Sequence, residues 1–323
     1  MLETFKSNRA STFLITTVLS IILFSSLFFI SQDVNNQVIN RSLLLQFTID
    51  SPKWLQYTIS FLLYVLAVWY ANFVVIKNQI LGSGNHLAGF FVLVLLAIGP
   101  NLFLENLIAP TSLLIICFFD RCFKIQKTAK PNPLILDASF ITGFLCMVYL
   151  PFVLLLLLVW TAALYSGGFN FKGWLLSIIS LFITLYLAQG VLFLFDLSYF
   201  PTLTGFSLQF NQDVTKVNQI FYYSFLALVL IAIPTSFSVL RFSKVILRNH
   251  FNLIFWSIPV FTIIFITTHL KIGQVSSFLF FPFSIILGQY FIKLKKKKLA
   301  NLALVVILIL VVAFQLYRII QPL

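Results

Sequence analysis

The sequence alternates long apolar runs with short polar segments along its whole length. The first apolar run covers about residues 11–31. Ten more follow at about 54–76, 87–104, 106–120, 135–150, 151–166, 173–195, 220–241, 251–269, 275–292 and 299–319. Apolar runs of about 17–25 residues can cross a bilayer as helices. The pattern therefore predicts an all-α, polytopic transmembrane bundle of about 11 helices.

The segment 135–166 allows two interpretations. It forms either two short helices that separate near Pro151 or one long kinked helix, because a proline inside a helix removes a hydrogen bond and bends the axis. The charge pattern favours two crossings. A single crossing would place the basic run "KLKKKK" of residues 293–298 on the side opposite to the other basic segments.

Composition supports a membrane protein without a large soluble part. Of the 323 residues, 60% are hydrophobic and only 9% are charged, whereas a soluble domain has about 25% charged residues. The first run follows Lys6 and Arg9 and lacks a small-residue cleavage site, so it is expected to stay as the first helix. We expect a single integral membrane domain, residues 1–323, with two longer outer loops at about 32–53 and 196–219.

The basic residues predict how the chain is oriented. The eleven-helix pattern places sixteen of the 21 basic residues on one side and leaves five on the other. Basic residues are enriched in cytoplasmic loops, so this pattern predicts a cytoplasmic N-terminus, an extracytoplasmic C-terminus and a location in a bacterial inner membrane. The formal charge of +13 is then explained without nucleic acid, and the "KLKKKK" run is expected to contact anionic membrane lipids.

Two acids on the predicted outer side are the candidates for catalysis. Asp33 follows the first helix, and Glu105 lies in the turn between the third and fourth helices. If these turns meet, one carboxylate can act as a general base, or the pair can hold a divalent metal through oxygen ligands. The alternative is that both are solvated acids at polar turns. The candidates for substrate binding on the same side are Arg41, Asp50, Lys53, Asp196, Lys216 and His269.

The remaining polar residues point to no catalytic motif. His86 and His250 fall in predicted cytoplasmic loops, where we expect them to be solvated. The three cysteines form no C-x-x-C pair and no zinc-binding spacing, so ordinary reduced thiols are expected.

Segment 71–160 resembles a multispanning membrane protein family of Bacteroidota to which no activity is assigned. The residues that carry the resemblance are "ANFVVIKNQIL", "LIAPTSLLIICFFDRCFKIQK" and "LILDASFITGFLCMVYLPFVLLLLLVW". The family shows a similar hairpin, a basic cytoplasmic stretch and an Asp-Ala pair that opens the next helix, here Asp137 and Ala138. The resemblance implies a polytopic helical fold.

The layout also resembles the C-type glycosyltransferase superfamily of membrane enzymes. The shared features are a long first outer loop with an early acid, here Asp33, a second acid between the third and fourth helices, here Glu105, and a short hairpin after a basic loop. The resemblance implies a sugar donor on a polyprenyl phosphate, with Asp33 as base and Glu105 binding a metal or the acceptor. It also implies that Arg41, Lys53 or Lys216 stabilises the leaving phosphate.

The chain departs from that superfamily in three ways. It has no Asp-Glu or Asp-x-Asp pair in the first loop and no Arg-x-Asp at the second turn, and we expect no soluble domain after the last helix. The fold can be shared while the chemistry is lost or changed. Three hypotheses therefore stay open: a glycosyltransferase-like protein, which handles a lipid-linked sugar or envelope precursor, a non-catalytic subunit or scaffold with membrane protein partners, and a transporter or lipid flippase.

Overall fold

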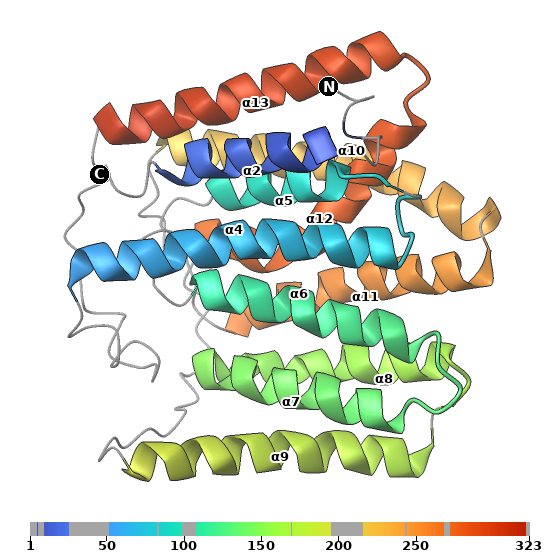
Figure 1. Cartoon of the computed structure of the whole chain (residues 1–323). Coiled ribbons are helices and arrows are strands. Elements are labelled where there is room, and N and C mark those ends of the chain that lie inside the picture. Colours follow the sequence, from blue (N-terminus) through green and yellow to red (C-terminus); the bar gives the residue numbers. More distant parts are fainter. Residues whose placement is uncertain are drawn as a thin grey trace.

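We describe the protein from a computed structural model of the chain (Figure 1). The structure describes residues 5, 10–25, 52–82, 84–98, 108–168, 170–194, 216–242, 244–267 and 272–320. Within these residues every regular element is helical, and their eleven α-helices confirm the predicted all-α class. Three of them are long and apolar enough to cross a membrane, over Tyr57–Lys77, Phe171–Val191 and Lys297–Tyr317.

Each predicted apolar run overlaps a helix of the described chain. In chain order the helices are α2 (Ala10–Ser25), α4 (Lys53–Lys77), α5 (Leu87–Ile98), α6 (Ile108–Ile125), α7 (Asn132–Val148), the 3₁₀ helix η2 (Leu150–Leu155), α8 (Leu156–Tyr165), α9 (Phe171–Leu194), α10 (Lys216–Phe242), α11 (Val245–Thr267), α12 (Ile272–Lys293) and α13 (Lys297–Ile320). The helices form one bundle, in which successive helices run in opposite directions (Figure 1).

This alternation brings the basic segments to one end of the bundle. The helix ends that connect α4 to α5, α6 to α7, α8 to α9, α10 to α11 and α12 to α13 all lie on the right in Figure 1. We call this the basic end, because Lys77, Lys127, Lys172, Lys244 and the run Lys295–Lys298 belong to it. Lys53 and Lys216, two of the predicted site residues, begin helices at the opposite end.

The hairpin at 135–166 consists of two helical segments, as the charge pattern favoured. The helix α7 ends where Tyr149 takes an extended conformation, with φ −143° and ψ 115°. Pro151 then lies in the first turn of η2, where its missing N–H costs no helical hydrogen bond. The chain therefore reverses direction at Tyr149, and η2 with α8 returns toward the basic end (Figure 1).

One predicted boundary is wrong in a way that matters for the polar contacts. The expected crossing 106–120 ended at its first acid, but α6 continues to Ile125 and carries Asp120, Arg121 and Lys124 within the helix. Cations are favourable near a helix C-terminus, because they oppose the partial negative charge of the last carbonyl groups. The helix therefore extends past the apolar run.

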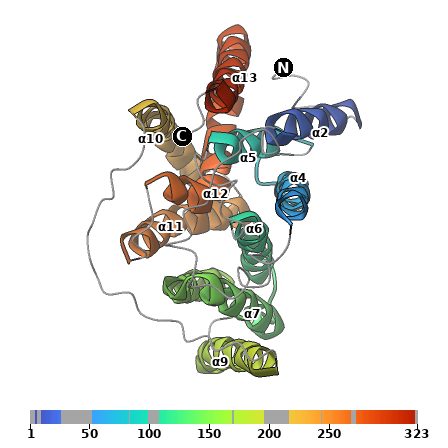
Figure 2. The ribbon, with the colours of Figure 1, turned by 90° about the vertical axis from the view of Figure 1, so that its left-hand side faces the viewer.

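The centre of the bundle lies around α5. All twelve residues of α5 are buried, and the helix packs against α4 and α12 and also contacts α2 and α13. Viewed along the bundle, α5 and α12 are surrounded by other helices, while α9 lies at the edge beside α7 (Figure 2).

Candidate functional site

Most of the residues predicted to form an outer site lie outside the described part of the chain. These are Asp33, Arg41, Asp50, Glu105, Asp196 and His269. Lys53 and Lys216 are the first residues of α4 and α10. The helix ends Ser25, Ile98, Ile108 and Leu194, which border the segments with Asp33, Glu105 and Asp196, lie at the same end as these two lysines (Figure 1). The outer site stays a prediction.

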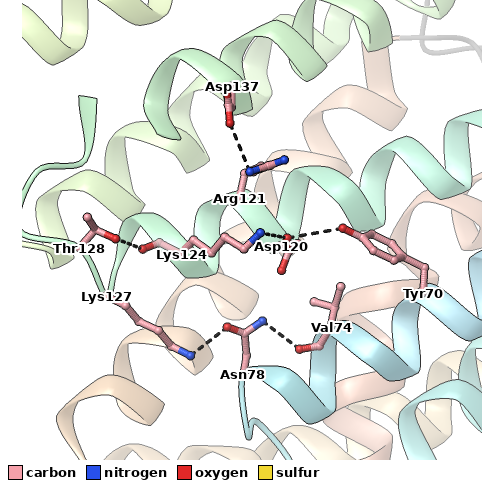
Figure 3. A network of polar contacts seen from close by, with 9 residues as sticks. All are labelled: Tyr70, Val74, Asn78, Asp120, Arg121, Lys124, Lys127, Thr128 and Asp137. Atoms are coloured by element: carbon pink, nitrogen blue, oxygen red, sulfur yellow. Dashed lines mark hydrogen bonds and ion pairs between the residues drawn. The ribbon is translucent and has the colours of Figure 1, made fainter. Parts of the chain in front are cut away.

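The described polar network lies toward the basic end, between α4 and α6 (Figure 3). Asp120 is its central residue, with only 2% of its side chain exposed. Its Oδ2 atom lies 2.5 Å from the Lys124 ammonium, one turn further along α6. The Tyr70 hydroxyl of α4 donates to the same oxygen at 3.5 Å. The second carboxylate oxygen, Oδ1, has no hydrogen-bond partner.

A second set of contacts caps the C-terminus of α4. The Asn78 side-chain amide donates to the Val74 carbonyl at 2.8 Å, and its oxygen accepts a hydrogen bond from the Lys127 ammonium at 2.9 Å. Lys127 is the second residue after α6, so this contact joins the ends of two helices (Figure 3). Partial burial lowers the pKa of Lys127; the negative charge of Asp120 opposes this, and the positive charge of Lys77 adds to it.

A third contact links α6 to α7. The Arg121 guanidinium lies 3.2 Å from the Asp137 carboxylate, and both side chains are more than one third exposed. Ion pairs in contact with water contribute about 0–1 kcal/mol. This pair therefore adds little to stability, whereas the Asp120–Lys124 pair is largely withdrawn from solvent.

His250 is buried, which corrects the expectation that it is solvated. Its Nδ1 atom lies 2.5 Å from Gln126 Oε1, and the Gln126 amide nitrogen donates to the Asn249 carbonyl at 3.1 Å. Because the Gln126 oxygen is then the acceptor, His250 carries its proton on Nδ1. The Nε2 atom is buried without a partner.

The apolar spacing of α11 was the signal that sequence reasoning missed. His250 precedes Phe251 and Ile254, which are both fully buried, and residues three or four apart lie on one helix face. His250 lies four residues before Ile254, so a helix that begins before residue 251 places both side chains on the same buried face.

His86 is also buried, and the prediction of a solvated loop histidine is wrong here too. Its backbone N–H donates to the Phe5 carbonyl at 2.8 Å. The side chain is 5% exposed, and neither ring nitrogen has a hydrogen-bond partner. Burial lowers the pKa of His86, because charge is unfavourable away from water. The neutral form is therefore favoured.

The described residues offer no ready metal centre. Among them no group of three or more His, Cys, Asp or Glu side chains gathers around a common point. Cys117, Cys122 and Cys146 form no disulfide with one another. The network at the basic end is suited to holding helices together and to presenting charge.

No family model, no curated protein and no solved structure matches the chain. The resemblances to a Bacteroidota membrane family and to the C-type glycosyltransferases therefore stay predictions from sequence patterns.

Proposed function

We propose that this chain is a multi-pass protein of a bacterial inner membrane in which all eleven helical segments cross the bilayer. The alternating helix directions support this proposal, because they gather the basic segments at one end (Figure 1). In this proposal the basic end faces the cytoplasm, following the bias of Lys and Arg in polytopic proteins. The N-terminus is then cytoplasmic and the C-terminus extracytoplasmic.

We further propose that the opposite end carries a glycosyltransferase-like site for a sugar or envelope precursor on a polyprenyl phosphate. One observation carries the proposal. The helix ends that border the segments of Asp33 and Glu105 share one end of the bundle with Lys53 and Lys216. On the extracytoplasmic side nucleotide sugars are absent, so a lipid-linked donor is the appropriate substrate class.

In the proposed reaction, the carboxylates and the cationic side chains of this end have separate roles. Asp33 accepts the proton of an acceptor hydroxyl, whose oxygen attacks the anomeric carbon of the donor sugar. The bond from that carbon to the phosphate oxygen breaks, and the polyprenyl phosphate leaves with the bonding electrons. Lys53, Lys216 and Arg41 stabilise the leaving phosphate by charge, and Glu105 binds the acceptor.

The substitution Asp33→Asn tests this proposal, because it removes the base while nearly preserving the size of the side chain. The variant is expressed in a strain of the source organism that lacks the protein, and envelope glycoconjugates are compared by mass spectrometry. The expected result is loss of the product that the wild-type chain restores. General bases contribute about 10²- to 10⁴-fold to a rate, so the loss should be nearly complete.

Asp213→Asn is the matched control, because Asp213 belongs to the other predicted outer loop and has no assigned role. It should restore the product at an equal membrane level of protein. Full restoration by Asp33→Asn would contradict the catalytic role and would favour the non-catalytic scaffold hypothesis instead.

A further inference from the structure

The outer face of α4 is a continuous apolar stripe that ends at a cation. Ile59, Leu62, Leu66 and Phe73 are all exposed, and their spacing places them along one side of the helix. Lys77 follows one turn after Phe73, and its ammonium lies 5.2 Å from the centre of the Phe73 ring. Because Tyr57–Lys77 is one of the three helical segments long and apolar enough to cross a membrane, this stripe is suited to contact with lipid chains.

The cations around this point fall into two classes. Lys124 and Arg121 are each paired with an acid, Asp120 and Asp137 respectively. Within the described residues, the structure gives no acid partner to Lys77 or Lys127. Both side chains are exposed. Two cations that form no ion pair within the described residues therefore lie at the end of the apolar stripe, although the charge of Asp120 also acts on Lys127.

The position of Lys127 relative to Lys77 is fixed by Asn78. The Lys127 ammonium donates to the Asn78 side-chain oxygen, and Asn78 immediately follows Lys77 at the end of α4. Burial is the main cause that lowers the pKa of Lys127; the Asp120 charge opposes this, and the nearby positive charge of Lys77 adds a smaller lowering. An anion between the two ammonium groups would remove this repulsion, and Lys127 keeps two N–H donors for it.

We propose that an anionic phospholipid binds at this place, with its phosphate between Lys77 and Lys127 and an acyl chain along the stripe of Ile59, Leu62, Leu66 and Phe73. Basic sites beside transmembrane helices recognise anionic head groups by this combination of charge and apolar contact. The stripe favours a lipid over free phosphate, because free phosphate has no apolar part to cover it. This proposal does not depend on the glycosyltransferase-like function.

Native mass spectrometry of the full chain in detergent can measure this binding. The chain is titrated with phosphatidylglycerol, and phosphatidylcholine serves as the neutral lipid. The double variant Lys77→Gln/Lys127→Gln should bind phosphatidylglycerol about 25-fold more weakly, since each lysine near a lipid surface contributes about fivefold. Binding of phosphatidylcholine should be weak in both proteins.

The matched control is Lys172→Gln/Lys244→Gln, which removes the same charge from two exposed positions at the basic end. It should bind phosphatidylglycerol like the wild type. An equal loss in this control would show general attraction to the basic surface, including the exposed run Lys295–Lys298, and would overturn the proposal.

Two further measurements keep the result decisive. Size-exclusion profiles and thermal unfolding should show that both double variants stay folded at the temperature of the titration, which separates loss of lipid from loss of fold. Glycerol phosphate is added as a competitor without acyl chains. If it displaces phosphatidylglycerol at equal concentration, the site recognises a free phosphate ester and the proposed lipid site is wrong.

Discussion

The helices α5 and α9 are both strongly apolar, yet they occupy opposite environments. Every residue of α5 is buried, whereas α9 packs mainly against α7 and exposes Phe182, Tyr186 and Phe193 on its outer side. Figure 2 shows α5 among other helices and α9 at the edge of the bundle. Apolar character alone therefore does not decide which helix lies at the centre of this bundle.

The two helices differ in how many neighbours they pack against: α5 contacts α2, α4, α12 and α13, whereas α9 packs mainly against α7. In α5, the Gly89 backbone N–H donates to the Asn72 side-chain oxygen of α4 at 2.8 Å, so the two helices approach closely. The α9 contacts all lie on one side, where Ser180 donates to the Leu136 carbonyl and Ser177 accepts from Trp160. Lipid is as apolar as a leucine side chain, so close packing and hydrogen bonds hold membrane helices together.

The largest expected effect comes from filling the close contact in α5. A Cβ atom at Gly89 would overlap the Asn72 side-chain amide, so Gly89→Leu must displace this amide and break its hydrogen bond to the Gly89 backbone. Overpacking costs about 1–3 kcal/mol, and we expect about 3 kcal/mol for this variant. Thermal unfolding of the purified chain in detergent should show a clearly lower midpoint.

Gly190→Leu in α9 is the matched control for this change. A Cβ at Gly190 would meet no atom within 4 Å, and Gly190 is exposed. The midpoint should therefore stay the same or rise slightly, since leucine favours helix more than glycine does. Equal losses from both substitutions would contradict the contrast between a packed centre and an open edge.

An intermediate effect is expected at the two ion pairs of α6. Asp120→Asn leaves Lys124 without its carboxylate in a largely buried place. Breaking a fully buried pair costs about 3–5 kcal/mol, but Lys124 is 27% exposed and can turn toward water. We expect a loss of about 2 kcal/mol, measured as the free energy of unfolding in denaturant with detergent present.

Asp137→Asn provides the comparison on the side of α6 that faces α7. Because Arg121 and Asp137 are both in contact with solvent, the loss should stay within about 0.5 kcal/mol. If this substitution were the more damaging one, the assignment of Asp120 as the central residue of the network would be wrong.

The last expected effect is a pH dependence of stability that arises at His86, in the connection between α4 and α5. Burial lowers the pKa of His86 in the folded chain, so below about pH 6.5 the unfolded chain binds a proton that the folded chain resists. Stability should therefore fall as the pH is lowered below this value, by at most about 1.4 kcal/mol per pH unit for one proton.

His86→Gln should reduce this dependence, because glutamine does not titrate. The measurement is the unfolding midpoint of both proteins between pH 5 and pH 8. The two curves should run parallel above pH 7 and separate below pH 6.5. Parallel curves over the whole range would mean that His86 is protonated equally in the folded and unfolded chain.

The positions of the helices could be predicted from the sequence, because each apolar run is a local signal. The break near Pro151 and the two-segment hairpin also followed from local rules and from the charge pattern. The boundary of α6 did not, since Asp120 and Lys124 look like the start of a loop. Their spacing of four residues is typical of a helical ion pair. Only the packed structure shows that Asp120 is buried and lies beside Tyr70 of α4.

The candidate sites differ in how much of their geometry can be predicted from the sequence. Asp33 and Glu105 were selected from their predicted positions, and they lie outside the described residues. The contact between Asn78 and Lys127 joins residues 49 positions apart, and the contact of His250 with Gln126 joins residues 124 apart. No local pattern predicts such pairs, because they depend on how helices pack.

The sequence by itself determined the all-helical class, the order of the helices and the segregation of the basic residues. These are local properties, because a helix satisfies its own backbone hydrogen bonds wherever it lies in an apolar environment. Only the tertiary structure decided that α5 is central and α9 peripheral, that Lys124 is paired while Lys77 is not, and that His86 is buried. Each depends on contacts between distant segments, which packing and interhelical hydrogen bonds select.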